Sequence, residues 1–304
     1  MNSFAGVYTP LATPFAADGS LDERGLAANV ARYLQTPLTG LVVLGSNGEA
    51  PQLDDAEADR AIAVVRDAMP KGRPLLAGTG RESTSATIAA SKRAADLGVD
   101  AVLVRTPSFY KGQMTSEAFV RHYTQVADQS PVPVLLYNVT IYTGVNLLPD
   151  AIATLSAHPN IVGIKETNSD MVQFGEYLSR AKPGFTVLAG SGATYYSALA
   201  LGAHGAVLAV GGVAPDLCMD MFKAAADGRF ADARAMQKKL APLARLVGAV
   251  HGVPGLKAAL DLLGFVGGAP RPPLLPVGQA ATDAIREQLI ALGLLKTTAD
   301  GRKA

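Results

Sequence analysis

The stretch that decides the fold is VPVLLY at residues 132–137, followed by a helical segment that opens at Pro149 and by IVGIK at residues 161–165. Both short runs are continuously apolar rather than alternating, which is typical of strands that are buried on both faces. A strand, a helix and a second strand in this order predict a parallel pair, because the helix carries the chain back before the second strand begins.

Six further apolar runs of the same kind recur along the chain, with helical segments between them. They cover residues 7–8, 41–44, 74–77, 101–104, 185–188 and 206–210. Eight strand–helix units predict an α/β fold, the closed (β/α)₈ TIM barrel. A doubly wound open sheet is the alternative, but the phosphate-binding glycine fingerprint that such a sheet favours after its first strand is absent from the sequence.

Helix start signals and a late change of pattern define the domains. Asp54 and Glu57 have the spacing of a capping box, in which each side chain accepts from a free backbone N–H, and Ser83 precedes another helical stretch. From about Ala225 onward only helices are predicted, over residues 230–250, 256–263 and 282–292. We therefore predict a barrel domain at residues 1–224 and a helical domain at residues 225–304.

The composition favours a compact globular protein that binds a small neutral or anionic metabolite. Of its 304 residues 49% are hydrophobic, and 27 Lys and Arg balance 26 Asp and Glu. With no basic surplus and no Trp, we expect no nucleic-acid partner. The single cysteine, Cys218, fits a reducing compartment, and no secretory leader pattern precedes Phe4, so a cytoplasmic location is expected.

One uncharged segment, residues 185–215, is long enough to cross a bilayer. Six glycines, together with Ser191, Thr194 and His204, divide it into strand, loop, helix, strand and loop. We therefore expect a buried soluble core and no membrane span.

Tyr137 and Lys165 close two neighbouring predicted strands, at the end where parallel barrels carry their active sites. Because neighbouring strands lie about 4.8 Å apart, the two side chains can meet at the barrel mouth. A lysine against an apolar wall loses solvation of its ammonium form, which leaves free amine to attack a carbonyl, and a phenol beside it can relay protons. The alternative is that Lys165 only marks where its strand reaches solvent.

The loop GSNGE at residues 45–49 follows the second predicted strand and offers groups that bind an anion. Its two glycines allow a tight turn with exposed N–H groups, and Ser46 and Asn47 add side-chain donors suited to a carboxylate. Ordinary turn chemistry is the alternative. We expect Glu49 to cap or pair within the fold. The four histidines lack paired metal-ligand spacing, so no metal site is predicted.

Six motifs cover essentially the whole chain in a fixed order. They are GVYTPLATPF at 6–15, GSNGE at 45–49, TPSFY at 106–110, YNV at 137–139, IKE at 164–166 and LAGS at 188–191. Together they resemble the motifs of the dihydrodipicolinate synthase/N-acetylneuraminate lyase family. The resemblance implies a (β/α)₈ barrel with a C-terminal helical domain, usually a homotetramer, and Schiff-base chemistry on pyruvate or a related 2-oxo acid. It implies no metal or organic cofactor, because a lysine imine is the electron sink.

The same resemblance implies catalytic roles for four positions. Lys165 matches the lysine that forms the imine with the 2-oxo carbon. Tyr137 matches the proton-relay tyrosine, which is held by Ser46 and by Tyr110, and in relatives the latter enters from the neighbouring subunit.

Binding roles follow in the same way. Ser46, Asn47 and the Gly48 backbone match the groups that hold the pyruvate carboxylate. Gly190, at the end of the seventh predicted strand, lies where relatives approach the rest of the substrate.

Further stretches, some remote from these positions, are similar to the 4-hydroxy-2-oxoglutarate aldolases within the family. They are MTS at 114–116, HYTQVA at 122–127, SPVPV at 130–134, HPNIVG at 158–163 and VPGLK at 253–257. This similarity implies a lyase that cleaves 4-hydroxy-2-oxoglutarate, or a similar short 2-oxo acid, to pyruvate and an aldehyde such as glyoxylate.

Two positions bear on the substrate, and other activities stay open. Dihydrodipicolinate synthases have an arginine after the YNV motif, where this chain has Tyr142, and a neutral phenol does not replace a bidentate guanidinium. Arg105 is a candidate for a distal carboxylate, although pairing on the surface is the favoured interpretation. The alternatives are a dihydrodipicolinate synthase-like synthase, a 2-keto-3-deoxy sugar acid dehydratase or aldolase with the same imine, and a non-catalytic binding member.

Overall fold

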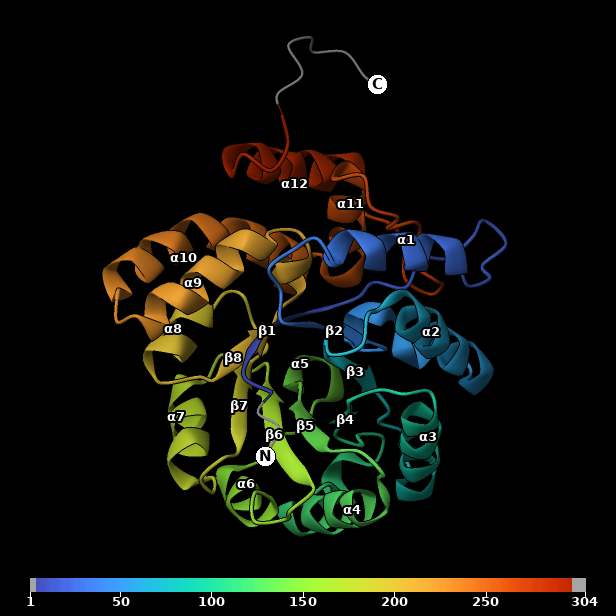
Figure 1. Cartoon of the computed structure of the whole chain (residues 1–304), viewed down its shortest axis with the longest axis vertical. Coiled ribbons are helices and arrows are strands. Elements are labelled where there is room, and N and C mark those ends of the chain that lie inside the picture. Colours follow the sequence, from blue (N-terminus) through green and yellow to red (C-terminus); the bar gives the residue numbers. More distant parts are fainter. Residues whose placement is uncertain (1–3, 297–304) are drawn as a thin grey trace.

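The computed structural model describes residues 4–296, which form a closed barrel of eight parallel strands (Figure 1). Each strand pairs with its neighbours in chain order, and the last strand returns to pair with the first. The strands are β1 (Gly6–Pro10), β2 (Gly40–Val43), β3 (Leu75–Gly78), β4 (Ala101–Arg105), β5 (Val134–Asn138), β6 (Ile161–Glu166), β7 (Thr186–Ala189) and β8 (Gly205–Val207). The predicted (β/α)₈ barrel is confirmed.

The eighth strand is shorter than the predicted run 206–210. It ends at Val207, and Ala209–Gly212 form a 3₁₀ turn instead, since two consecutive glycines favour a turn. Gly205 lets this last strand close against β1, because a Cβ there would lie 1.9 Å from the Gly6 carbonyl oxygen.

Helices cover the outside of the barrel and extend beyond it (Figure 1). The barrel helices are α1 (Glu23–Tyr33), α2 (Asp55–Ala68), α3 (Thr84–Asp96), α4 (Ser116–Gln129), α5 (Thr140–Thr143), α6 (Pro149–Leu155), α7 (Met171–Arg180), α8 (Tyr195–Ala200) and α9 (Pro215–Ala226). The C-terminal helices are α10 (Phe230–Arg245), α11 (Gly252–Leu262) and α12 (Gln279–Ala291), with a π-helical turn at Leu246–Val250 between α10 and α11. The predicted domain boundary after residue 224 falls in the last turn of α9.

Local capping explains where the predicted helices begin. Asp54 accepts from the Glu57 N–H at 2.8 Å, and the Glu57 carboxylate accepts from the Asp54 N–H, so the predicted capping box is present. The Ser83 hydroxyl accepts from the Ala86 N–H, which caps α3 as expected. These bonds satisfy backbone donors that the first turn of a helix leaves free.

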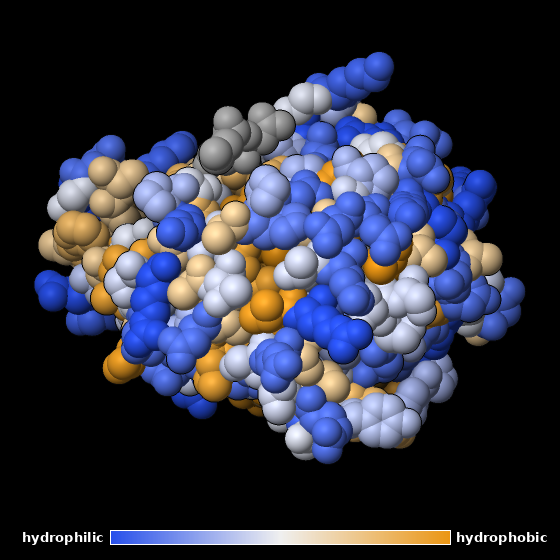
Figure 2. All heavy atoms as spheres, turned by 90° about the horizontal axis from the view of Figure 1, so that it is seen from below, coloured by the Kyte–Doolittle hydropathy of each residue, from blue (hydrophilic) through white to orange (hydrophobic). Residues whose placement is uncertain are grey.

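Apolar side chains fill both the barrel interior and the layer between strands and helices. The uncharged segment 185–215 divides into β7, α8, β8 and the 3₁₀ turn, and none of the helices within residues 4–296 is both long and apolar enough to cross a membrane. Cys218 lies fully buried, and burial raises the pKa of its thiol to about 12. On the face drawn in Figure 2, polar residues are interspersed with smaller apolar areas, the most continuous near the centre.

A buried ion pair joins the barrel to the C-terminal helices. The Glu49 carboxylate lies 2.6 Å from the Lys257 ammonium, and both side chains are at most 1% exposed. Lys257 also donates to the Ala269 carbonyl at 2.9 Å, while Glu49 accepts from the Arg271 N–H at 2.8 Å. Burial lowers the pKa of Lys257, and the adjacent Glu49 carboxylate opposes that shift. The expectation that Glu49 pairs within the fold is confirmed.

Removing the cation of this pair should destabilise the protein strongly. We expect Lys257→Met to lower the free energy of unfolding by about 3–5 kcal/mol, because it leaves a buried carboxylate without its counter-ion. Urea unfolding followed by circular dichroism measures the change, with Lys238→Met, on the exposed face of α10, as the matched control.

The double variant Glu49→Gln/Lys257→Met removes both charges and should recover most of the lost stability. A Lys257→Met protein that unfolds within about 1 kcal/mol of the Lys238→Met control would contradict the importance of the pair.

Candidate active site

Lys165 and Tyr137 lie side by side at the mouth of the barrel. The register of β5 with β6 pairs Tyr137 directly with Lys165, as the sequence predicted for neighbouring strands. The Lys165 amine lies 4.2 Å from the centroid of the Tyr137 ring, and the lysine is only 3% exposed. Within residues 4–296, no carboxylate forms an ion pair with Lys165. The lysine therefore does not simply mark where its strand reaches solvent.

Ser46 completes a row of three functional groups. Its hydroxyl lies 3.3 Å from the Tyr137 hydroxyl, and either oxygen can donate. Tyr137 therefore contacts both neighbours, with its ring face at the Lys165 amine and its hydroxyl at the Ser46 hydroxyl. The structure thus brings together three of the four residues that were predicted to be catalytic.

The loop that carries Ser46 is held in a strained conformation. Leu44 and Glu49, which flank it, both have positive φ, at 56° and 55°, and such non-glycine residues cost about 1–3 kcal/mol each. The Thr13 hydroxyl donates to the Gly48 carbonyl at 2.6 Å, and a Cβ on Gly48 would lie 3.1 Å from the Leu11 carbonyl oxygen. The ion pair of Glu49 with the C-terminal helices therefore fixes one end of a loop that would otherwise relax.

A cavity of about 380 Å³ opens above Lys165, and several of the predicted binding residues line it. Asn47, Tyr142 and Gly190 line it together with Tyr137 and Lys165. Most of the other residues that line the cavity have small side chains or side chains with a hydroxyl or amide group.

Gly190 has no room for a side chain, because a Cβ would lie 2.2 Å from the Thr167 hydroxyl oxygen. That hydroxyl is buried and has no hydrogen-bond partner among the described residues, and Thr167 is one of the residues that line the cavity. The Gly190 N–H donates to the Glu166 carbonyl at 2.6 Å, which keeps the end of β7 against β6.

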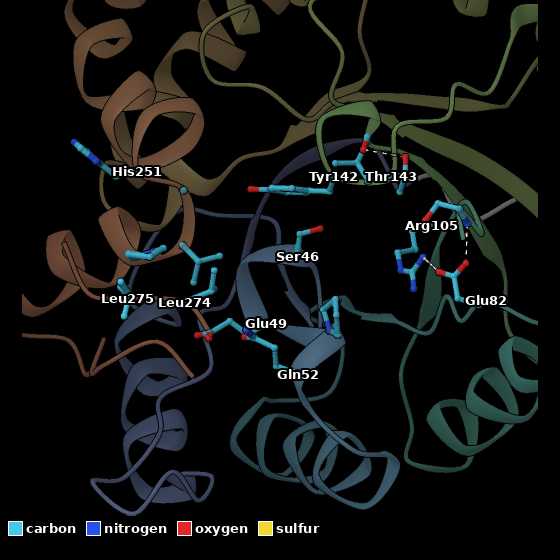
Figure 3. Close-up of a pocket in the computed structure, with 16 residues that line it drawn as sticks. Ser46, Glu49, Gln52, Glu82, Arg105, Tyr142, Thr143, His251, Leu274 and Leu275 are labelled. Atoms are coloured by element: carbon cyan, nitrogen blue, oxygen red, sulfur yellow. Dashed lines mark hydrogen bonds and ion pairs between the residues drawn. The ribbon is translucent and has the colours of Figure 1, made fainter. Parts of the chain in front are cut away.

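A second cavity, of about 590 Å³, is also lined by Tyr142 (Figure 3). Ser46 and Arg105 line it from the barrel, whereas His251 and Leu275 line it from the C-terminal region. Tyr142 borders both cavities and is 57% exposed. The two cavities thus share Tyr142, the residue that stands where the sequence analysis notes an arginine in dihydrodipicolinate synthases.

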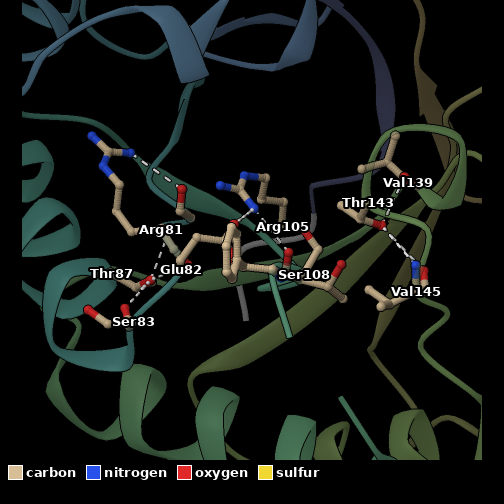
Figure 4. Close-up of polar contacts among 12 residues, drawn as sticks. Arg81, Glu82, Ser83, Thr87, Arg105, Ser108, Val139, Thr143 and Val145 are labelled. Atoms are coloured by element: carbon tan, nitrogen blue, oxygen red, sulfur yellow. Dashed lines mark hydrogen bonds and ion pairs between the residues drawn. The ribbon is translucent and has the colours of Figure 1, made fainter. Parts of the chain in front are cut away.

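Arg105 forms an ion pair rather than facing Lys165 (Figure 4). Its guanidinium donates to the Glu82 carboxylate at 2.7 Å, and the Ser108 and Phe109 amides donate to the same carboxylate at 2.8 Å. Burial disfavours the charged carboxylate, but these three donors outweigh burial and hold the pKa of Glu82 below its usual range. Arg105 borders the larger cavity and not the one above Lys165, which agrees with the favoured interpretation of surface pairing.

Tyr110 does not reach Lys165 within its own chain. It is 70% exposed, and its ring packs edge-on against that of Phe109, which is 77% exposed, at a centroid distance of 5.0 Å. An exposed aromatic pair on a loop is what the predicted contribution to a neighbouring subunit requires, and that contribution stays a prediction.

Glu166 follows Lys165 directly but belongs to a separate buried network. It accepts from the Asn138 and Gln173 amides at 2.7 and 3.2 Å. Burial raises the pKa of Glu166, although these hydrogen bonds oppose the shift. The carboxyl is thus engaged with β5 and α7 and does not neutralise the lysine.

Thr167 and Arg245 are among the residues lining the cavity above Lys165 that sequence reasoning missed. Thr167 lies two residues after Lys165, so its place just beyond the carboxyl end of β6 was a usable signal. Arg245 ends α10, which was expected to be a separate helical domain, and no motif connects it to the barrel.

Known proteins are similar to this one over nearly the whole chain. A 4-hydroxy-tetrahydrodipicolinate synthase of Methanothrix thermoacetophila is 37% identical over 94% of this chain and 96% of its own length. The dihydrodipicolinate synthase of Acinetobacter baumannii, solved with pyruvate, superimposes with a TM-score of 0.92 at 29% identity, over 96% of this chain and 100% of that one. A prophage protein of the dihydrodipicolinic acid synthase family from E. coli K12, also solved with pyruvate, gives 0.89 at 32% identity, over 96% and 99%.

The names of these relatives can be compared with the family resemblance predicted from the sequence. They are named as dihydrodipicolinate synthases, so the closer similarity to 4-hydroxy-2-oxoglutarate aldolases is not confirmed. The signature of the Dihydrodipicolinate synthetase family matches residues 3–292. With this match and the shared barrel, the chain belongs to the dihydrodipicolinate synthetase family of class I Schiff-base lyases and synthases that act on pyruvate.

Proposed function

We propose that Lys165 forms an imine with pyruvate and uses it to make or break a carbon–carbon bond. The observation that carries this proposal is the row formed by the buried Lys165 amine, the Tyr137 ring at 4.2 Å and the Ser46 hydroxyl at 3.3 Å from the Tyr137 hydroxyl. A buried amine without a carboxylate partner is suited to attack a carbonyl.

In this proposal the loop at residues 46–48 binds the substrate carboxylate, and the Tyr137 and Ser46 hydroxyls transfer protons. The pyruvate carboxylate accepts hydrogen bonds from the Ser46 and Asn47 side chains, which places its carbonyl carbon at the Lys165 amine. The Gly48 N–H closes the loop by donating to the Gly45 carbonyl at 2.9 Å. Attack followed by loss of water gives the protonated imine, and loss of a C3 proton gives the enamine. Tyr137 and Ser46 carry the protons that these steps transfer.

The second substrate decides the reaction, and the named relatives favour synthesis. In that direction the nucleophilic enamine carbon attacks an aldehyde and a C–C bond forms. The new alkoxide takes its proton from the Tyr137 and Ser46 hydroxyl pair, and hydrolysis of the imine releases Lys165. A dihydrodipicolinate synthase-like condensation is therefore the first candidate.

Cleavage of 4-hydroxy-2-oxoglutarate is the second candidate, because Tyr142 stands where the synthases have an arginine. In that direction the C3–C4 bond breaks and its electron pair passes into the imine. The C4 hydroxyl loses its proton to the same hydroxyl pair as glyoxylate forms. Protonation of the enamine at C3 and hydrolysis then release pyruvate.

The same proposal includes a homotetramer in a cytoplasmic setting. The exposed Phe109 and Tyr110 rings support an interface at this loop, since apolar rings of this size favour burial against a partner. The larger cavity beside Ser46 offers space for such a loop.

Substitutions of Lys165 and Tyr137 should separate imine formation from proton transfer. We expect Lys165→Ala to abolish turnover, and Tyr137→Phe to lower kcat by about 10²-fold or more, because proton transfer loses its relay. Steady-state assays of pyruvate formation or consumption measure both, with Lys182→Ala, an exposed lysine, as control. Full turnover by Lys165→Ala would refute the proposal.

A pair of assays should assign the second substrate. Condensation is measured as formation of 4-hydroxy-tetrahydrodipicolinate from pyruvate and the matching amino-acid semialdehyde, and cleavage as pyruvate release from 4-hydroxy-2-oxoglutarate. We expect one kcat/KM to exceed the other by about 10²-fold, because a buried site built for one polar substrate leaves groups unpaired with another. Comparable values for both would contradict a single-substrate assignment.

A further inference from the structure

Helix α10 is hydrogen-bonded to the loop that follows β7 at the mouth of the barrel. The Gln237 side chain donates to the Gly192 carbonyl at 2.9 Å and accepts from the Tyr196 N–H at 2.9 Å, so it ties the helix to the loop after β7 and to α8. Two turns farther along, Ala244 packs against the same loop, because a Cβ on Gly192 would lie 3.0 Å from the Ala244 Cβ. The end of α10 is therefore held beside the cavity that contains Lys165.

Arg245, the next residue, lines that cavity together with Lys165. Its side chain has no ion pair or hydrogen bond to any residue in the described part of the chain. Arg105, by contrast, is engaged by Glu82. Arg245 is thus a cation at the site that the fold leaves free.

The charged side chains that line the cavity, among the described residues, are all cations. Among the described residues that line it, Lys165 and Arg245 are the ionisable cations, and no aspartate or glutamate is present. The π-helical turn at Leu246–Val250 widens the helix directly after Arg245 and lines the cavity through Gly248 and Ala249, which have small side chains. π-helical turns are rare in proteins as a whole, and those that occur are often found at functional sites. Space and positive charge therefore occur together at the end of the cavity formed by α10.

We propose that Arg245 binds a second anionic group, a carboxylate at the far end of the substrate, and so selects dianionic over monoanionic 2-oxo acids. This inference rests on the proposed imine chemistry at Lys165, with the 2-oxo carboxylate held by the loop at residues 46–48. A guanidinium suits this task, because its fork of N–H donors matches a carboxylate in two parallel hydrogen bonds. It also supplies, from the C-terminal helices, the cation that Tyr142 does not.

Two 2-oxo acids of equal chain length test the proposal. 2-Oxoglutarate carries a distal carboxylate, whereas 2-oxopentanoate ends in a methyl group, and both have the carbonyl that Lys165 attacks. Imines are trapped with cyanoborohydride at a series of concentrations, and intact-mass spectrometry gives the concentration for half-maximal labelling of each acid. The ratio of the two values isolates the distal carboxylate.

We expect Arg245→Gln to reduce the preference for 2-oxoglutarate over 2-oxopentanoate by about tenfold, the loss typical of one charged hydrogen-bonding partner. Arg245→Lys should restore part of the preference, because it keeps the charge without the fork. Arg234→Gln is the matched control, since Arg234 is an exposed arginine earlier on the same helix.

An unchanged ratio in Arg245→Gln would overturn the inference, as would an equal change in Arg234→Gln. Trapping of pyruvate by the unmodified protein is measured in parallel. If pyruvate is not trapped, the proposed function fails, whereas trapping of pyruvate with an Arg245-independent ratio refutes only the role of Arg245.

Discussion

Parallel pairing of β5 with β6, which keeps one register from Leu135 to Asn138 after an irregularity at Val134, is the constraint on which the site depends. It places Tyr137 directly beside Lys165 at the rim where all eight strands end, and barrel closure brings the loops after β2 and β7 to the same rim. The loop after β2 needs further support, because both residues that flank it have positive φ. The buried pair of Glu49 with Lys257 supplies that support from the C-terminal helices, so catalytic geometry and domain packing are coupled.

Much of this arrangement is predictable from the sequence, because it follows from local patterns. Continuous apolar runs give the strands, capping spacings give helix starts, and a lysine at the end of a buried strand indicates the site. Contacts between residues far apart in the chain have no such local signal. Neither the partnership of Glu82 with Arg105 nor the place of Arg245 above Lys165 follows from residue spacing, since each depends on how a loop or helix packs across the barrel rim.

The C-terminal helices form a wall of the candidate site as well as an extension of the barrel. Gln237 ties α10 to the loop after β7, and the following π-helical turn lines the cavity with small side chains. In the proposed account the barrel carries the imine chemistry, and a helix outside the barrel selects among 2-oxo acids.

The most direct test of the account is the site of covalent labelling by pyruvate. The protein is incubated with pyruvate, reduced with borohydride, digested and mapped by tandem mass spectrometry. The account predicts that the adduct lies on Lys165 and that the buried Lys257, which is held in its ion pair, stays unmodified. An adduct on another lysine, or a folded protein without any adduct, would contradict it.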